Sequence, residues 1–286
     1  MIRRIQSPDA EPVAEFLDRF TLANRWMVAF FRHFSELPRD AVPYWGLWLE
    51  EGDAGAGGGP DILAVAAHNF SSGISYVAGV GEFNAGELEA VIEEDLLPER
   101  LVGDVSFLER WRGRSTRIFS RVEGKEELVI LALPPGELDR SGLPARGFRR
   151  AVKADRPRLA ELERLYARER GQEEPLSDLA SLIERGLIFV YEEGEQVVGV
   201  VRSNLSDGRY VHLGGLFVHP AHRRAGIGVK LLAGICDDIH RSGAVALLDT
   251  DQGNGAALAA YRSVGFKEVG RGQVLRFGED AWSGGG

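Results

Sequence analysis

The second half of the chain has a pattern of hydrophobic and polar positions that predicts regular secondary structure. Apolar residues recur three and four positions apart over 155–170, which is the spacing of one buried helical face. Apolar runs on either side of Gly194 and Gly208 predict antiparallel strands, because glycine adopts the positive φ of a hairpin turn at little cost. The predicted strands are 148–152, 187–192, 196–203, 209–218, 244–250, 267–269 and 273–277, and the predicted helices are 155–170, 177–185, 226–241 and 254–264. Antiparallel strands followed by a crossover helix indicate a mixed sheet.

The first half has a similar order of elements with a weaker signal. We expect a helical region at 10–34, three or four strands between 44 and 80, a helix at 85–97, and strands near 116–122 and 127–133. The glycine-rich segment 52–60 lies between two strand-like runs and lacks the Lys-Ser/Thr of a nucleotide-binding loop. It is therefore predicted to connect a hairpin.

The two halves also begin alike. Ile2-Arg3-Arg4 followed by Asp9 matches Phe148-Arg149-Arg150 followed by Asp155, at a constant offset of 146 residues. In each copy, a short strand leads to a helix-capping Asp and an amphipathic helix. Many α/β units start in this way, so coincidence stays open, but the equal lengths of the halves favour duplication. The Pro- and Gly-rich segment 134–144 separates them, and we expect domains at 1–143 and 144–286.

Composition and charge narrow the range of partners. A hydrophobic fraction of 44% with 27% charged residues is typical of a folded globular protein. The net charge of -9 argues against non-specific binding to nucleic acid or anionic lipid, and favours a cationic partner. No apolar run approaches the ~20 residues that span a bilayer, and the first residues lack the apolar core of a signal peptide. We therefore expect a cytoplasmic protein with no membrane or nucleic-acid partner.

A candidate anion site lies between a predicted strand and a predicted helix. The strand ends at Pro220, a basic turn with Arg223 and Arg224 follows, and Gly226 and Gly228 open the helix. The first N–H groups of a helix lack intrahelical partners and face the positive end of its dipole, so they bind phosphate oxygens. Tight packing of a helix on a strand also selects glycine, so this spacing alone leaves both interpretations open.

Two segments resemble the GNAT superfamily of N-acetyltransferases. Arg223-Arg224-Ala225-Gly226-Ile227-Gly228 is similar to the family's Arg/Gln-x-x-Gly-x-Gly/Ala phosphate loop. The segment from Asn254 through Tyr261 to Gly265-Phe266 is similar to its Asn-x-x-Ala-x-x-x-Tyr-x-x-x-Gly-Phe pattern. The resemblance covers about 147–277 and implies an α/β (α+β) fold, with a mixed, mostly antiparallel sheet flanked by helices in each of two GNAT-like domains.

The resemblance also implies acetyl-CoA as the donor. The backbone of Leu216, Phe217 and Val218 would pair with the pantetheine arm. Amides of the phosphate loop would hold the pyrophosphate, and Arg223 would add positive charge. The implied loop residues are Arg224, Ala225, Gly226, Ile227, Gly228 and Val229. Asn254 would contact the pantetheine arm while capping the next helix.

Tyr261 is the implied proton donor to the sulfur of the leaving thiolate. The thiolate gains negative charge as acyl transfer proceeds, and a phenol at hydrogen-bond distance stabilises it. The alternative is that Tyr261 only packs on Phe266.

The sequence says less about which residues would bind and deprotonate the acceptor amine. His212 lies four residues before Leu216 and titrates in the right range to take the amine's proton, although a structural strand histidine is equally open. Asp249 and Asp251 follow a predicted strand and would attract a cationic acceptor, or only solvate a loop. Glu173 and Glu174 lie where the family often contacts its acceptor, or form a solvent face.

The first half departs from the motif. Glu82 and Glu87 stand where an anion site needs arginine and paired glycines, and their charge repels pyrophosphate. We therefore interpret this half as a degenerate GNAT-like domain without a coenzyme site. His219 and His222 have no further ligand nearby in the sequence, so no metal is expected.

The sequence thus predicts an N-acetyltransferase that moves an acetyl group from acetyl-CoA to a primary amine of a small molecule or peptide. Direct attack within a ternary complex is the expected mechanism. An acyl-CoA-sensing module without turnover and a transferase of a different acyl group are the alternatives.

Overall fold

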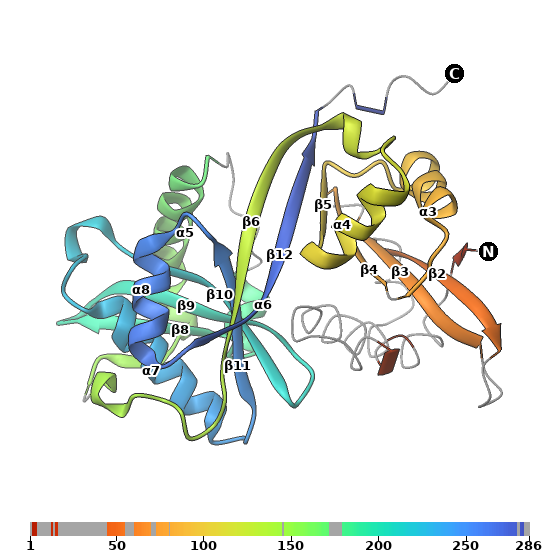
Figure 1. Cartoon of the computed structure of the whole chain (residues 1–286). Coiled ribbons are helices and arrows are strands. Elements are labelled where there is room, and N and C mark those ends of the chain that lie inside the picture. The colour runs from red at the N-terminus through yellow and green to blue at the C-terminus, as the bar shows by residue number, and fades with distance from the viewer. Residues whose placement is uncertain are drawn as a thin grey trace. The chain divides into compact units, whose positions relative to one another are not determined.

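The computed structural model describes residues 2–4, 13, 15–16, 45–54, 60–69, 73–79, 81–144, 146–171, 179–278 and 281–282. The chain forms two compact units, and Figure 1 shows their elements. The first unit consists of Met1–Ile130 with Val269–Gly286, and the second of Leu131–Glu268. These units differ from the expected linear division at 143 and 144, because the end of the chain returns to the first unit.

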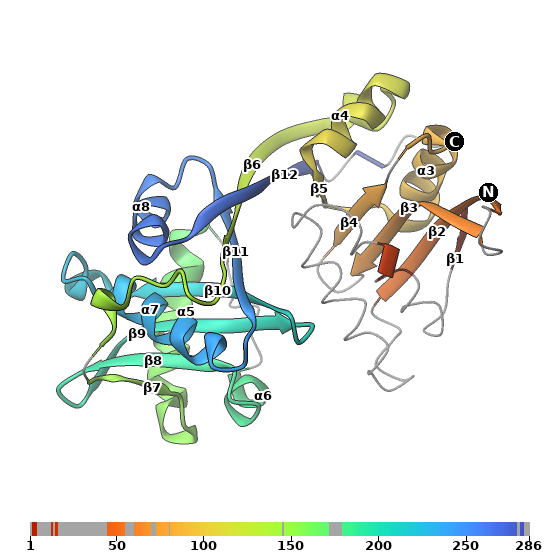
Figure 2. The same ribbon diagram turned by 60° about the horizontal axis from the view of Figure 1, so that its bottom comes forward.

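The second unit has the elements that its hydrophobic pattern predicts. Its strands are β7 (Phe148–Arg150), β8 (Ile188–Glu193), β9 (Gln196–Ser206), β10 (Tyr210–Val218) and β11 (Val245–Asp251), and its α-helices are α5 (Arg156–Glu169), α6 (Leu179–Glu184), α7 (Ile227–His240) and α8 (Gly255–Val264). The strand order is β6-β11-β10-β9-β8-β7, in which β10 and β11 are parallel and the described pairs among β7 to β10 are antiparallel. Figure 2 shows β7 to β10 side by side. The mixed sheet is thus confirmed.

Helices cover the two faces of this sheet, as the alternation of side chains along β9 requires. Val200 belongs to the core cluster that contains Leu159 and Leu162 of α5. The neighbouring Gly199 faces the other helix, because a Cβ there would lie 2.8 Å from Leu231 Cδ1 of α7. Successive residues of a strand point to opposite faces, so α5 and α7 pack on opposite sides.

The first unit contains a smaller set of elements around its own sheet. Its strands are β1 (Ile2–Arg4), β2 (Trp45–Ala54), β3 (Pro60–Asn69), β4 (Ile74–Gly79), β5 (Arg100–Asp104), most of β6 (Val122–Leu133) and most of β12 (Lys267–Phe277), and its helices are α3 (Ala85–Val91), the π-helical η4 (Ile92–Leu96), α4 (Val105–Arg114) and the 3-10 turn η5 (Phe119–Arg121). The strand order is β1-β2-β3-β4-β5-β12-β6. β2 and β3 are antiparallel, so the expected hairpin across 52–60 is confirmed. The helical region expected at 10–34 lies almost entirely outside the described residues.

Two elements of the first unit escaped prediction, and one predicted strand is wrong. β5 has only five residues, and α4 follows it at once, with Asp104 Oδ1 accepting the Ser106 N–H at 2.9 Å as the helix cap. The strand expected at 116–122 is instead a turn followed by η5. Ile118 in this turn is fully buried, and its N–H donates to the Glu89 carboxylate at 3.3 Å. The apolar side chain of Ile118 is therefore part of the core, although Ile118 does not lie in a strand.

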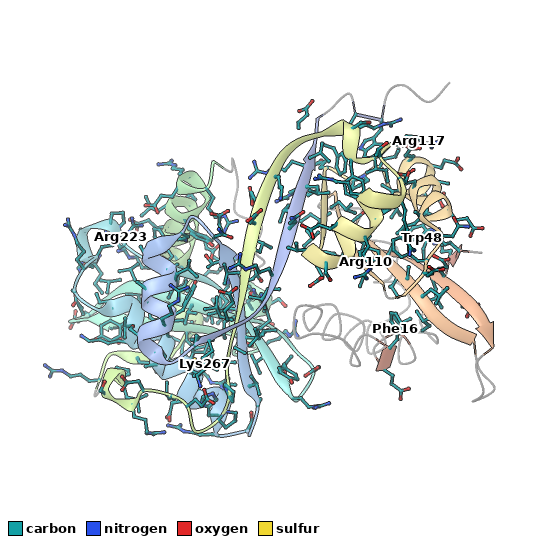
Figure 3. The ribbon with its side chains drawn as sticks, in the orientation of Figure 1. Phe16, Trp48, Arg110, Arg117, Arg223 and Lys267 are labelled. Atoms are coloured by element: carbon teal, nitrogen blue, oxygen red, sulfur yellow. The ribbon has the colours of Figure 1, made fainter. Side chains whose placement is uncertain are left out.

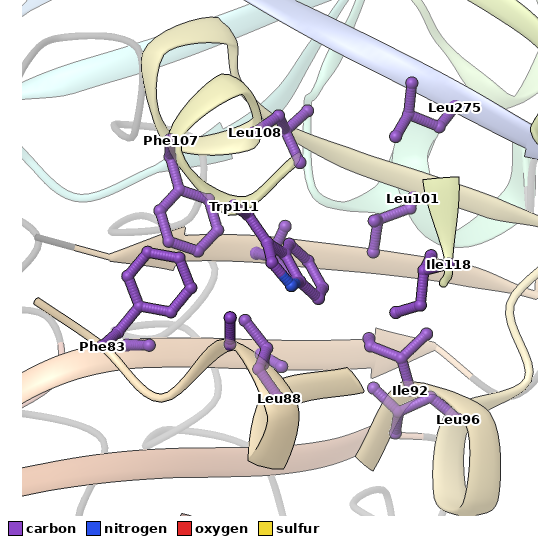
Figure 4. Packing of buried hydrophobic residues seen from close by; sticks show 14 of the residues in the cluster. Phe83, Leu88, Ile92, Leu96, Leu101, Phe107, Leu108, Trp111, Ile118 and Leu275 are labelled. Carbon is purple, nitrogen blue, oxygen red and sulfur yellow. The ribbon is translucent and has the colours of Figure 1, made fainter. Parts of the chain in front are cut away.

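The core of the first unit lies between α3, α4 and the strands. Trp111 and Phe107 of α4 lie against Phe83 and Leu88, as Figure 4 shows. The ring centroids of Phe83 and Phe107 are 4.9 Å apart. In the same core cluster, the Trp48 indole N–H donates to Asp95 at 3.2 Å, and Figure 3 marks Trp48. Aromatic side chains therefore pack together with aliphatic ones in this core.

The repeat detected in the sequence has a structural counterpart. Ile2–Arg4 and Phe148–Arg150 both form three-residue strands. The first pairs antiparallel with β2 and the second with β8, so each unit begins with a short edge strand. This agreement supports the interpretation that the halves arose by duplication.

His68 predicts a pH dependence of folding in the first unit. Its ring is 3% exposed, Nδ1 lies 2.8 Å from Ser75 Oγ, and burial lowers its pKa to about 4. Between about pH 6.5 and 4 the unfolded chain therefore binds the extra proton, and stability is lost as the pH falls through this window. We expect His68 to account for up to about 3 kcal/mol of this loss.

Urea unfolding at several pH values measures this effect. All five tryptophans lie in the first unit's part of the sequence, so their fluorescence reports that unit. His68→Gln should flatten the acid dependence of the tryptophan transition, whereas His240→Gln in the second unit should leave it unchanged. An equally steep dependence in His68→Gln would contradict the prediction.

Candidate active site

The site is organised by the divergence of two parallel strands. β10 and β11 pair from Tyr210 opposite Val245 to His212 opposite Leu247, and their pairing ends there. On its other side, β10 stays paired with β9, with an irregular register between Gly214 and Phe217. One backbone edge of β10 after His212 is thus not paired with β11. Such an edge offers N–H and C=O groups to an extended ligand.

A loop suited to anions follows β10. Arg224 has φ +63° and Gly226 has φ +74°, and left-handed residues in such a loop turn successive N–H groups toward one concave side. α7 starts at Ile227 without a side-chain cap, and its first helical hydrogen bond runs from the Lys230 N–H to the Gly226 carbonyl at 3.0 Å. The preceding N–H groups therefore have no partner within the helix.

The loop glycines are not explained by tight packing. A Cβ added to Gly226 would meet nothing within 4 Å, and one added to Gly228 would lie 3.9 Å from Val218 Cγ2, an ordinary contact. Glycine is favoured at position 226 because the backbone there is left-handed. Neither glycine places a side chain over the surface of the loop. The anion-site interpretation is therefore favoured over the packing alternative.

Arg223 points toward α5. Its Nε donates to the Val218 carbonyl at 3.0 Å, and its Nη2 contacts both carboxylate oxygens of Glu169 at 2.7 and 2.8 Å. The guanidinium also lies over the Phe217 ring, 5.3 Å from its centroid. Figure 3 marks Arg223. Its charge is thus paired with Glu169, so the loop's N–H groups are the main candidates for binding an anion.

Tyr261 is a buried phenol on α8. Asn254 caps this helix, with its side-chain oxygen accepting the Ala257 N–H at 3.2 Å. Tyr261 is 8% exposed, and its ring meets Phe266 edge-on at 6.0 Å, so the packing role is real. Burial, with smaller contributions from Tyr166 and Asp249, raises its pKa to about 12. The hydroxyl therefore carries its proton at neutral pH.

His212 and Asp249 form a pair across β10 and β11. His212 Nε2 lies 2.8 Å from Asp249 Oδ1, and the Asp249 side chain keeps 36% of its surface exposed. Desolvation opposes the charge of this carboxylate, but the hydrogen bond from His212 and the charges of His212 and Arg170 outweigh it and hold its pKa below the ordinary range. An accessible anion thus lies beside an imidazole and within electrostatic reach of Tyr261.

The comparison with protein families gives a match in this part of the chain. The sequence model described as "Acetyltransferase (GNAT) family" matches residues 156–266, which contain the diverging strands, the loop, His212 and Tyr261. Residues 156–266 are therefore similar in sequence to GNAT acetyltransferases. A search of curated proteins finds no match to the chain.

Solved structures resemble the whole chain and show its tandem GNAT fold. A GNAT-family acetyltransferase from Colwellia psychrerythraea has a TM-score of 0.61 at 15% identity, covering 97% of this chain and 100% of the other. A tandem GNAT protein from the clavulanic acid biosynthesis pathway has a TM-score of 0.58 at 14% identity, covering 97% and 98%. A GCN5-related N-acetyltransferase from Sphaerobacter thermophilus has a TM-score of 0.61 at 17% identity, covering 96% and 94%.

The first unit lacks the features of the GNAT coenzyme loop. α3 is capped by its own Asn84, whose side chain accepts the Glu87 N–H at 3.1 Å. The Asn84 N–H donates to the buried Glu50 at 2.7 Å, and burial raises the pKa of Glu50. A Cβ on Gly79, at the end of β4, would lie 2.6 Å from the Phe107 ring, so a side chain fills that space. An anion here would meet glutamates.

Two residues near the GNAT site were not selected from the sequence. Tyr166 lies at the end of α5 with its ring 5.6 Å from Phe217, and its hydroxyl accepts a hydrogen bond from Arg170 Nη1 at 3.0 Å. Tyr166 raises the pKa of Tyr261, and Arg170 lowers that of Asp249. Their four-residue spacing places both on one helical face. This spacing was the available signal, and it was interpreted only as helix periodicity.

The other candidate residues lie elsewhere or outside the described residues. Asp251 accepts the Gly253 N–H at 2.6 Å and so stabilises the turn before α8. Glu173 and Glu174 fall in 172–178, which the structure does not describe. Among described residues, no group of three or more His, Cys, Asp or Glu side chains could hold a metal ion, and no helix is long and apolar enough to cross a membrane.

Gly226 tests the loop directly. A carboxylate in Gly226→Asp would face the anion and occupy its space, so we expect acetyl-CoA binding to fall below detection in calorimetry. Gly208→Asp is the matched control, because Gly208 also has positive φ (+83°) and open space around it. The unaltered chain should bind one acetyl-CoA. Two tight sites per chain, or equal binding by both variants, would refute this assignment.

Proposed function

We propose that the protein is an N-acetyltransferase that moves an acetyl group from acetyl-CoA to a primary amine of a small molecule or peptide. The observation that carries the proposal is the grouping of a protonated phenol, an imidazole and an accessible carboxylate beside the diverging strands. Tyr261 supplies the phenol, and His212 with Asp249 supplies the pair. A proton donor and a proton acceptor are the two groups that acyl transfer to an amine requires.

The second unit has groups that fit the coenzyme. The free edge of β10 at Leu216–Val218 would hold the pantetheine arm, and the N–H groups of Arg224–Val229 would hold the pyrophosphate. Asn254 lies at the start of α8, where its amide would reach the arm. The bound coenzyme supplies an activated thioester, and the remaining chemistry belongs to side chains of this chain.

His212 and Asp249 would prepare the acceptor. An amine is mostly protonated at neutral pH and attacks only after losing its proton. Asp249, ionised and 36% exposed, would attract the ammonium form, and the imidazole of His212 would take the proton directly or through water. The net charge of -9 favours the approach of a cationic acceptor in the same way.

Tyr261 would act on the leaving thiolate of the coenzyme and not on the acceptor amine. Its pKa of about 12 keeps the hydroxyl protonated, so it can donate a hydrogen bond or a proton as charge develops on sulfur. A module that only senses acyl-CoA needs the phosphate loop but neither this phenol nor the His212–Asp249 pair. Their joint presence supports turnover.

Incubating the whole chain with acetyl-CoA and a panel of amines tests the proposal. Mass spectrometry should detect an acetylated product and free coenzyme in equal amounts. Tight acetyl-CoA binding without any acetylated amine would favour the sensing module. Preference for a longer acyl donor in the same assay would favour transfer of a different acyl group.

Tyr261→Phe should lower kcat by ~10 to 1,000-fold with little change in the Kd for acetyl-CoA, because the hydroxyl matters once charge builds on sulfur. Stopped-flow or single-turnover kinetics isolate the chemical step. Tyr191→Phe is the matched control, since Tyr191 is also 8% exposed but lies on β8. An unchanged chemical rate in Tyr261→Phe would leave Tyr261 with its packing role alone.

His212→Gln and Asp249→Asn should affect the acceptor more than the donor. We expect His212→Gln to lower kcat by on the order of 100-fold at pH 7, with partial recovery at high pH, where more of the amine is already unprotonated. Asp249→Asn should raise the acceptor KM as well, because the cation loses its partner. Initial rates against amine concentration from pH 6 to 10 measure both effects. A profile unchanged by either substitution would contradict the assigned roles.

A further inference from the structure

Two adjacent glycines on β10 make room for two side chains of β9. A Cβ on Gly214 would lie 2.2 Å from Asn204 Nδ2, and a Cβ on Gly215 would lie 2.4 Å from Arg202 Nε. Gly215 also has φ +59°, whereas no left-handed φ is found at Gly214. Gly214 is therefore required for space alone, and the group that takes this space is the Asn204 amide.

The Asn204 amide reaches the imidazole of His212. Asn204 Nδ2 lies 3.4 Å from His212 Nδ1, while His212 Nε2 lies 2.8 Å from Asp249 Oδ1. An ionised carboxylate only accepts hydrogen bonds, so Nε2 carries a proton toward Asp249. In the neutral ring, Nδ1 is then the acceptor, and the amide NH2 of Asn204 is the donor that matches it.

We propose that Asn204 is a positioning residue that, together with Asp249 on the other nitrogen, holds the neutral His212 ring as the Nε2–H tautomer, and that Gly214 leaves the space that the Asn204 amide occupies. The amide suits both states of the ring. Nδ1 is the only nitrogen of this tautomer that can take the amine's proton, so the Asn204 N–H leaves it as the amine or a relaying water approaches. When Nδ1 then carries the proton and becomes a donor, a half-turn of the amide presents Oδ1 to it. An ionised aspartate at position 204 could only accept a hydrogen bond, so it would suit only the charged ring. A leucine could form no hydrogen bond with either state. The kinetic part of this inference rests on the proposed function, but the tautomer does not.

The surroundings of His212 define what a titration will report. The ionisable groups near it are Asp249 on β11, Arg170 on α5, which acts on Asp249, and Tyr261 on α8. Arg202, two residues before Asn204 on β9, is paired with the buried Glu163 at 3.3 Å. Asn204 is uncharged and exposed, so replacing it leaves these charges and the core in place.

Nuclear magnetic resonance of the full chain with 15N-labelled histidine tests the tautomer. Long-range 1H–15N correlations distinguish Nδ1 from Nε2 protonation, and His212→Gln assigns the signal. We expect the Nε2–H form in the unaltered chain, a weaker preference with a detectable Nδ1–H fraction in Asn204→Leu, where Asp249 alone favours Nε2–H, and a doubly protonated ring that persists about one pH unit higher in Asn204→Asp. Ser203→Ala, at the neighbouring position of β9, should change nothing.

Kinetics of the same variants test the positioning role. Asn204→Leu should lower kcat on the order of 10-fold with an unchanged Kd for acetyl-CoA, and Asn204→Asp should move the acid limb of the pH profile upward by about one unit. Gly214→Ala should reproduce Asn204→Leu, because its methyl displaces the amide. If Gly214→Ala does not fold, the double variant Asn204→Ala/Gly214→Ala removes the clash and should fold with the tautomer preference still weakened.

The outcomes separate the two proposals. An Nδ1–H tautomer in the unaltered chain, or an unchanged tautomer in Asn204→Leu, would overturn the positioning role whatever the enzyme's activity. The expected tautomers in a chain that acetylates no amine would support the role of Asn204 and count against the proposed function alone.

Discussion

The end of the β10–β11 pairing at His212 is the constraint on which the rest of the site depends. Parallel strands that continued together would satisfy each other's backbone groups and leave no edge for a ligand. Because the pairing stops, the edge after His212 becomes available, and the chain reaches the phosphate loop within a few residues. The last paired residues, His212 and Leu247, also place Asp249 just beyond the pairing on β11. One interruption therefore produces both the strand edge that we propose for the coenzyme and the His212–Asp249 pair that we propose for the acceptor.

The two units show how the same fold gains or loses an anion site through a few side chains. In the second unit, the helix after the fourth strand starts at an uncapped glycine with arginines before it. In the first unit, the corresponding helix is capped by Asn84, and Glu50 receives the Asn84 N–H. The cap satisfies an N–H group that an anion would otherwise use, and the glutamates repel negative charge. Packing in the first unit is retained without the electrostatics of binding.

The features that could be predicted from the sequence are those encoded by residues close together along the chain. The glycine turn before α7, the Asn254 cap and the helical periods of the second half are each encoded in consecutive residues, so all correspond to observed features. Whether the turn binds phosphate stays a prediction. β5 and α4 were missed because a five-residue strand next to a capped helix has no distinct period. The partners of the site side chains were also beyond reach: Arg223 meets Glu169, 54 positions away, and His212 meets Asp249, 37 positions away. Such pairs depend on strand register and helix docking, which a single sequence does not specify.

The path of β12 explains why a linear division of the chain is physically unsuitable. Residues 272–276 of this strand pair with 104–100 of β5, and the strand lies between β5 and β6 in the first unit's sheet. Leu275 is fully buried there, and removal of such a side chain alone typically costs about 2–5 kcal/mol. A fragment ending at residue 143 would lose a central strand together with Leu275 and Phe277. It would expose the edges of β5 and β6, which is the usual route to aggregation. The first unit is therefore completed by the last strand of the chain, and it can form fully only after that strand has been synthesised.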